Sequence, residues 1–225
     1  MEIQRKIYLD ALLRKRQNGL IKIITGIRRC GKSYLLRTLF KQQLLREGVP
    51  ADHILEMSFD SIANAAYLDP HKFYDLARSQ TRGEGLYYIL LDEIQLMDNF
   101  EAVLNGLNDQ KNVDLYVTGS NARFLSKDIV TEFAGRGDEI HMYPLSFREF
   151  MSVYEGEAFR GVLEYLTYGG IPLVVLAAAQ DKAPLLHSLF AETYIRDIIK
   201  RHRVRNPREL EDLLNILASA IATGS

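Results

Sequence analysis

Residues 20–33 read Leu20-Ile21-Lys22-Ile23-Ile24-Thr25-Gly26-Ile27-Arg28-Arg29-Cys30-Gly31-Lys32-Ser33, a strand-like apolar run that passes directly into a glycine-rich loop. The last eight residues match the pattern G-x-x-x-x-G-K-[ST], and a helical apolar stripe follows them. The glycines let the backbone curl so that successive N–H groups face phosphate oxygens, and the helix that starts at Ser33 adds its positive end. The stretch therefore predicts a phosphate-binding loop between a buried strand and a helix.

The polar side chains of this loop have distinct expected tasks. We expect Lys32 to bridge β- and γ-phosphates and the Ser33 hydroxyl to be a magnesium ligand, because that hard cation prefers oxygen. The motif does not require Arg28 and Arg29. Their side chains either contact phosphate or are solvated charges of the loop. The expected nucleotide-binding residues are Gly26, Ile27, Arg28, Arg29, Cys30, Gly31, Lys32, Ser33 and Tyr34.

A second apolar run, residues 87–91, ends in the two carboxylates Asp92 and Glu93, which is the form of a Walker B element. In such an element Asp92 holds magnesium through its water shell, and Glu93 orients and deprotonates the attacking water. An apolar run ending in Asp-Glu is by itself only a strand entering a loop. The phosphate loop upstream favours the catalytic interpretation, and a kinase would not need the second carboxylate.

The apolar run at residues 115–118 leads into Gly119, Ser120 and Asn121. Ligands of α/β sheets bind outside the carboxyl ends of the strands, so Asn121 or Ser120 is placed to hydrogen-bond the γ-phosphate or the lytic water. An ordinary turn or helix cap at Ser120 is the alternative. We retain Asn121 as a candidate catalytic residue.

Arg136 stands between two glycines shortly before the last expected strand. A guanidinium there is a candidate arginine finger, which would stabilise charge on the transferring phosphoryl group in cis or from a neighbouring subunit. The alternative is a surface arginine in a flexible turn. The action between subunits would require a homo-oligomer.

Compact apolar runs alternate with helical stripes along most of the chain, which indicates a parallel sheet covered on both faces. The clearest helix begins at Ser33, with Gly48 as its C-terminal stop. The predicted class is α/β, with a five-stranded P-loop NTPase sheet flanked by helices. Strands are expected near residues 20–25, 54–59, 86–91, 115–118 and 139–143.

From Ser146 onward the strand signal disappears, and apolar stripes around Phe147 and Leu185 suggest consecutive helices. We expect an ATPase core at 1–145, a helical lid at 146–203, and the start of a C-terminal domain at 204–225.

Composition narrows the class of protein. The chain has 225 residues, 47% of them hydrophobic and 25% charged, with a net charge of -1, so no polyanion-binding field covers its whole surface. Cys30 is the single cysteine, which fits a reducing cytoplasm. Residues 1–17 lack the apolar core of a signal peptide, and the longest apolar run, 171–179, is too short to span a bilayer. We expect a soluble cytoplasmic protein.

These motifs resemble those of the AAA-type (AAA+ superfamily) ATPases of bacteria and archaea that carry a C-terminal domain of unknown function, relatives of archaeal ATPases and signal-transduction NTPases. The resemblance implies an AAA+ fold, ATP and Mg²⁺. Family members continue into a longer C-terminal domain whose opening resembles residues 194–217, so the chain is expected to be truncated. The resemblance rests on residues 24–33, 91–95, 117–121, 135–136, 143–150 and 168–172.

Two functions agree with these observations. The leading hypothesis is Mg²⁺-dependent ATP hydrolysis that drives a conformational switch or remodels an unknown protein or nucleic-acid target. The alternative is a nucleotide-dependent binding module with little turnover, associated with DNA through a basic cluster. The alternative interpretation of that cluster, which we prefer, is a solvated helix end facing another domain. The cluster comprises Arg196, Lys200, Arg201, Arg203, Arg205 and Arg208.

Overall fold

The computed structural model describes residues 3–119, 133, 135–191, 199 and 206–222. The chain divides into two compact units, Met1–Pro172 and Leu173–Ser225. The boundary between them falls inside the expected lid region, 146–203, so the helices that directly follow the sheet belong to the first unit.

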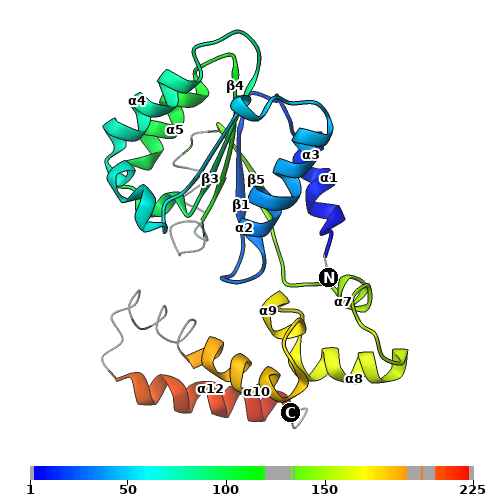
Figure 1. Cartoon of the computed structure of the whole chain (residues 1–225). Coiled ribbons are helices and arrows are strands. Elements are labelled where there is room, and N and C mark those ends of the chain that lie inside the picture. The colour runs from blue at the N-terminus through cyan, green and yellow to red at the C-terminus, as the bar shows by residue number, and fades with distance from the viewer. Residues whose placement is uncertain (1–2, 120–132, 134, 192–198, 200–205, 223–225) are drawn as a thin grey trace. The chain divides into compact units, whose positions relative to one another are not determined.

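A five-stranded sheet is the framework of the first unit (Figure 1). Its order is β2-β3-β4-β1-β5, and every pairing is parallel. The predicted five strands and their parallel arrangement are confirmed, with small shifts at the ends. The strands are β1 (Ile21–Thr25), β2 (Ile54–Ser58), β3 (Tyr87–Asp92), β4 (Val113–Thr118) and β5 (Gly137–His141).

Both faces of the sheet are buried, which explains why its central strands are apolar over nearly their whole length. Successive side chains point to opposite faces, so Ile23 enters one core and Ile24 the other. Helices α4 (Pro70–Gln80) and α5 (Phe100–Asn108) cover the first face, as Figure 1 shows. Helix α1 (Lys6–Arg14) and the helix after β1 cover the second.

The helix after β1 begins at the phosphate loop, as the sequence predicted. It consists of α2 (Lys32–Tyr34), the π-helical segment η1 (Leu35–Phe40) and α3 (Lys41–Arg46). Gly48 ends it with φ 87°, and the Gly48 N–H donates to Leu45 O at 3.1 Å. π-helical turns inside longer helices are frequent at functional sites, and this one follows the loop directly.

The remaining elements are helical. None of the described residues after β5 forms a strand, which confirms the predicted change to helices. Within the described residues, no helix is both long and apolar enough to cross a membrane. The short 3₁₀ elements are η2 (Ala51–His53), η3 (Ile62–Leu68) and η4 (Ile94–Leu96), and the helices are α7 (Phe147–Met151), α8 (Ala158–Tyr168), α9 (Pro172–Val175), α10 (Ala179–Ser188) and α12 (Pro207–Ala222).

Candidate functional site

The loop after β1 closes around the Lys32 side chain. Lys32 Nζ donates to Gly26 O and Ile27 O, both at 2.9 Å. Gly26 has φ 136°, and a Cβ atom there would lie 2.1 Å from Met142 O, so only glycine fits. Burial lowers the pKa of Lys32 from its ordinary value. An anion at this loop would supply the counter-charge that the buried ammonium group lacks.

The other loop side chains point to different environments. The Cys30 thiol is fully buried in the core beneath α1, and burial raises its pKa. Its side chain is therefore structural, and any contact of Cys30 with a ligand would come from its backbone. Arg28 and Arg29 are exposed, as is Tyr34. Their roles as nucleotide contacts remain predictions.

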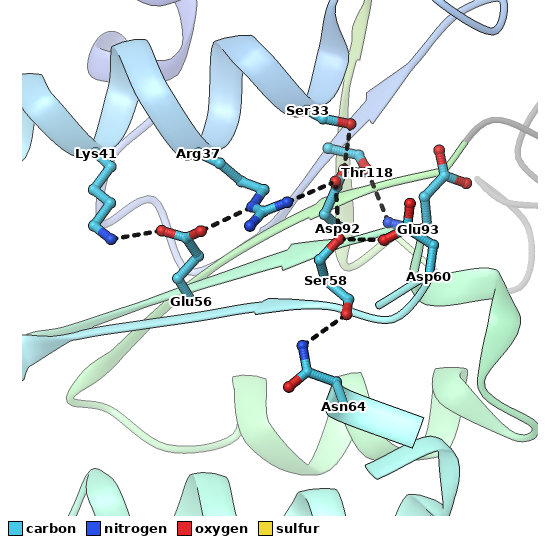
Figure 2. A network of polar contacts seen from close by, with 10 residues as sticks. All are labelled: Ser33, Arg37, Lys41, Glu56, Ser58, Asp60, Asn64, Asp92, Glu93 and Thr118. Atoms are coloured by element: carbon cyan, nitrogen blue, oxygen red, sulfur yellow. Dashed lines mark hydrogen bonds and ion pairs between the residues drawn. The ribbon is translucent and has the colours of Figure 1, made fainter. Parts of the chain in front are cut away.

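Ser33 and Asp92 lie side by side, as expected for a magnesium-binding pair (Figure 2). Ser33 Oγ donates to Asp92 Oδ1 at 2.9 Å. A hydroxyl has one proton and two lone pairs, so this bond leaves both lone pairs of Ser33 available to a cation. Two hard oxygen donors next to a phosphate loop fit Mg²⁺, and these two residues would hold it.

Three further side chains surround Asp92, and sequence reasoning missed them (Figure 2). Thr118 Oγ1 donates to Asp92 Oδ1 at 2.5 Å. Ser58 Oγ lies 3.4 Å and Arg37 Nη1 3.8 Å from Asp92 Oδ2. Each residue has a local signal, since Ser58 and Thr118 are polar ends of apolar strands and Arg37 is one turn after Ser33. The strand order is needed to see that all three meet at Asp92.

Glu56 of β2 pairs with two cations of the helix after the loop, Arg37 and Lys41. Its carboxylate accepts from Arg37 Nε at 2.8 Å and from Lys41 Nζ at 2.6 Å. Arg37 therefore reaches both Glu56 and the neighbourhood of Asp92, whereas Lys41 is paired with Glu56 (Figure 2).

Glu93 adopts the left-handed conformation, with φ 55° and ψ 43°. Such a conformation is unfavourable for a non-glycine residue and is concentrated at functional sites. The backbone N–H of Glu93 donates to Thr118 Oγ1 at 3.1 Å, and Gln95 Nε2 donates to the Glu93 carboxylate. Thr118 and Gln95 thus fix the direction of Glu93. Gln95 has no role in the sequence interpretation, although it follows Glu93 by two residues.

Arg136 lies away from the phosphate loop of its own chain. Its carbonyl accepts from Ile21 N at 2.8 Å, at the start of β1, whereas the loop follows the other end of that strand. Five residues of strand separate the two ends by roughly 16 Å. Arg136 Nη1 is 3.5 Å from Asp109 Oδ1, and the arginine side chain is 50% exposed. This placement does not bring Arg136 to its own site, and action on a neighbouring subunit stays a prediction.

The candidate residues Ser120 and Asn121 lie outside the described residues, as does most of the basic cluster. The contact of Asn121 with the γ-phosphate stays a prediction.

The parallel sheet of order β2-β3-β4-β1-β5, with a phosphate loop after β1 and carboxylates at the end of β3, defines a P-loop NTPase of the AAA+ type. Residues 18–151 match the family model described as AAA domain, and the chain belongs to this family. Residues 160–224 match a model described as Domain of unknown function (DUF8612). Family membership suggests nucleotide binding.

Two curated relatives are described as uncharacterized proteins. An uncharacterized protein of Haemophilus influenzae is 32% identical, and the match covers 97% of this chain and 56% of the relative. A second relative, from Methanocaldococcus jannaschii, is 28% identical, and the match covers 90% of this chain and 47% of the relative. The chain spans about half the length of these curated relatives.

Solved structures resemble this chain in fold. A crystal structure of a DNA replication initiation factor superposes with a TM-score of 0.51 at 15% identity, covering 90% of this chain and 65% of that one. At such low identity the likeness concerns the fold alone.

Proposed function

We propose that this protein binds ATP with Mg²⁺ at the loop after β1 and hydrolyses it, and that hydrolysis drives a conformational change acting on a protein or nucleic-acid target. The observation that carries the proposal is the convergence of three kinds of group. A buried lysine, a hydroxyl–carboxylate pair and an oriented glutamate, namely Lys32, Ser33 with Asp92, and Glu93, adjoin at the carboxyl ends of β1 and β3.

The residues divide the work of phosphoryl transfer. Lys32 would exchange its two carbonyl acceptors for β- and γ-phosphate oxygens, which restores a counter-charge to a buried cation. Mg²⁺ would neutralise charge on the phosphates when bound. Ser33 and Asp92 would hold the ion, and Thr118 keeps the Asp92 carboxylate in one orientation. Glu93 would orient the attacking water and accept its proton.

Steady-state ATP hydrolysis by the isolated chain, with and without Mg²⁺, tests the proposal. We expect Mg²⁺-dependent turnover that is lost in Lys32→Met, because the variant removes the main charge facing the phosphates. Lys41→Met is the matched control, since Lys41 lies on the same helix and pairs with Glu56. It should bind ATP as the wild type does.

The outcomes separate the candidate functions. ATP binding by calorimetry without turnover would favour the nucleotide-dependent binding module. Absence of binding in the wild type would overturn the proposal. A change in turnover on adding double-stranded DNA, weakened at higher salt, would identify nucleic acid as the target.

A further inference from the structure

Arg5 is a buried arginine that the proposed reaction leaves without a role. The residue is 3% exposed and precedes α1 with φ 44° and ψ 41°. Arginine is almost never fully buried unless it is paired, and a non-glycine residue in the left-handed region is strained. Both features indicate that contacts with the surrounding structure hold Arg5 in this buried, strained conformation.

The guanidinium of Arg5 joins three segments that are distant in the sequence. Its Nη1 donates to Cys30 O at 3.3 Å and its Nη2 to Tyr143 O at 2.5 Å. Its Nε lies 3.2 Å from Glu149 Oε1, an ion-pair contact. Arg5 therefore connects the N-terminal segment to the phosphate loop and to the connection between β5 and α7. Figure 1 shows the N-terminal end of α1 near α7.

The contact with Cys30 O bears directly on the loop. The peptide group between Cys30 and Gly31 is planar and trans, so its oxygen and the Gly31 N–H point in opposite directions. Gly31 has φ 102°, and glycine allows either orientation of the preceding peptide. The hydrogen bond from Arg5 selects one orientation, and the Gly31 N–H is thereby directed away from Arg5.

Glu149 fixes α7 to the same guanidinium. Its Oε2 accepts from the Ser146 N–H at 2.8 Å, within a capping box that starts α7. Its Oε1 faces Arg5, so the two oxygens of one carboxylate serve the helix start and the arginine. The glutamate of the Ser-Phe-Arg-Glu block thus has a physical task, which is to hold Arg5 against the loop.

We propose that Arg5 is a positioning residue for the phosphate-binding loop. It holds the Cys30–Gly31 peptide in the orientation that presents the Gly31 N–H to a phosphate oxygen. The inference rests on the proposed binding of ATP at this loop. Without Arg5 the loop would occupy the competent orientation only part of the time, and the apparent Kd for ATP rises in inverse proportion to that fraction.

Two variants test this role. Arg5→Lys keeps the charge, but one ammonium group cannot match the planar fork that reaches three acceptors. The double variant Arg5→Met/Glu149→Gln removes the ion pair without leaving a carboxylate unpaired. For both we expect an increase of about tenfold in the Kd and KM for ATP, as for a loop that is competent about a tenth of the time. The kcat of the saturated enzyme should stay within about threefold, because ATP binding restores the loop.

The controls separate positioning from general stability. Glu149→Gln alone keeps both carbonyl contacts of Arg5 but removes the carboxylate that faces its Nε, so we expect a smaller rise in the Kd for ATP than in the double variant. Lys6→Ala is the silent control, because it removes an exposed neighbouring cation, and its ATP affinity should equal that of the wild type. A purely structural role would lower the unfolding temperature of the variants and leave the KM of the folded fraction unchanged. Equal ATP affinity in the wild type and folded variants would overturn the role of Arg5 alone, whereas a wild type that binds no ATP overturns the proposed function as well.

Discussion

Thr118 Oγ1 donates to Asp92 Oδ1 at 2.5 Å, across the β3–β4 pairing, and Thr118 Oγ1 in turn accepts the backbone N–H of Glu93 at 3.1 Å. One side chain thus contacts the carboxylate of Asp92 and the backbone of Glu93. We expect Thr118→Val to lower ATP turnover by about 10- to 100-fold, the usual effect of removing a group that orients a metal ligand. Steady-state hydrolysis as a function of Mg²⁺ concentration measures it.

Thr81→Val is the matched control for Thr118→Val. Thr81 is also buried and hydrogen-bonded, to Ala77 O at 2.9 Å, but it lies at the end of α4. Both variants should lose a similar free energy of unfolding, about 1–3 kcal/mol, because each leaves a buried acceptor with one donor fewer. Equal turnover in the two variants would contradict a specific role for Thr118.

The two carboxylates should give different phenotypes. Glu93→Gln is expected to keep ATP and Mg²⁺ bound while hydrolysis falls by about 10²–10⁴-fold, because the amide cannot accept the proton of water. Asp92→Asn is expected to weaken the dependence of ATP binding on Mg²⁺. Calorimetry and single-turnover hydrolysis distinguish them. Hydrolysis at the wild-type rate in Glu93→Gln would assign water activation to another residue.

ATP binding should be linked to proton uptake at alkaline pH. Burial lowers the pKa of Lys32 below its ordinary value of 10.5 in the nucleotide-free protein, and bound phosphates would raise it again. Between those two pKa values the complex holds a proton that the free protein lacks, so affinity should fall as pH rises through the lower one. Calorimetry in buffers of different ionisation enthalpy counts the protons. Lys32→Arg should abolish this uptake, because guanidinium does not titrate in that range.

A buried ion pair between neighbouring strands should make the stability of the protein sensitive to the loss of either partner. Lys22 and Asp114 have 0% and 3% exposed side chains, and the Lys22 ammonium donates to the Asp114 carboxylate. Lys22→Met should cost about 3–5 kcal/mol of unfolding free energy, because Asp114 is left buried without its counter-charge. Urea denaturation provides the measurement.

The surface pair Lys15 and Asp138 is the comparison for that experiment, since the Lys15 side chain is 33% exposed. Lys15→Met should cost about 0–1 kcal/mol, as surface salt bridges contribute little. Similar losses in Lys22→Met and Lys15→Met would show that burial of the inner pair is not the source of its effect.

Arg136 is predicted to act on a neighbouring subunit, because it lies at the opposite end of β5 from its own phosphate loop. Arg136→Ala should lower turnover by about 10³–10⁵-fold with a smaller effect on ATP affinity. Specific activity of the wild type should rise with protein concentration, and mixing Arg136→Ala with Glu93→Gln chains should restore some activity.

Asp109→Ala is the control for Arg136→Ala. It removes the surface contact of Arg136 at 3.5 Å and should leave turnover unchanged. A fully active Arg136→Ala variant would leave Arg136 as a surface charge, and turnover independent of concentration without rescue would exclude the action between subunits.

Local patterns were enough to predict the loop, the strands and the succession of elements. The segment from β1 to the helix after the loop is predictable from local sequence. Its apolar run, its two glycines and the helical stripe that follows are all properties of neighbouring residues. The carboxylates Asp92 and Glu93 were found for the same reason, because they directly follow the apolar run of β3.

The pairing of strands was decided by the tertiary structure alone. Because β1 lies between β4 and β5, Lys22 meets Asp114 and becomes a buried ion pair, although its own strand reads as apolar. Thr118 reaches Asp92 for the same reason, since β4 is the neighbour of β3.

The sequence by itself determined the phosphate-binding loop, the class of fold and the candidate carboxylates, because short-range periodicity and turn chemistry specify each of them. Only the tertiary structure brought Arg5 to Cys30, placed Thr118 against Asp92, and located Arg136 far from its own loop. These contacts join residues that are far apart in the sequence. They arise because whole strands and helices pack together to bury both faces of the sheet.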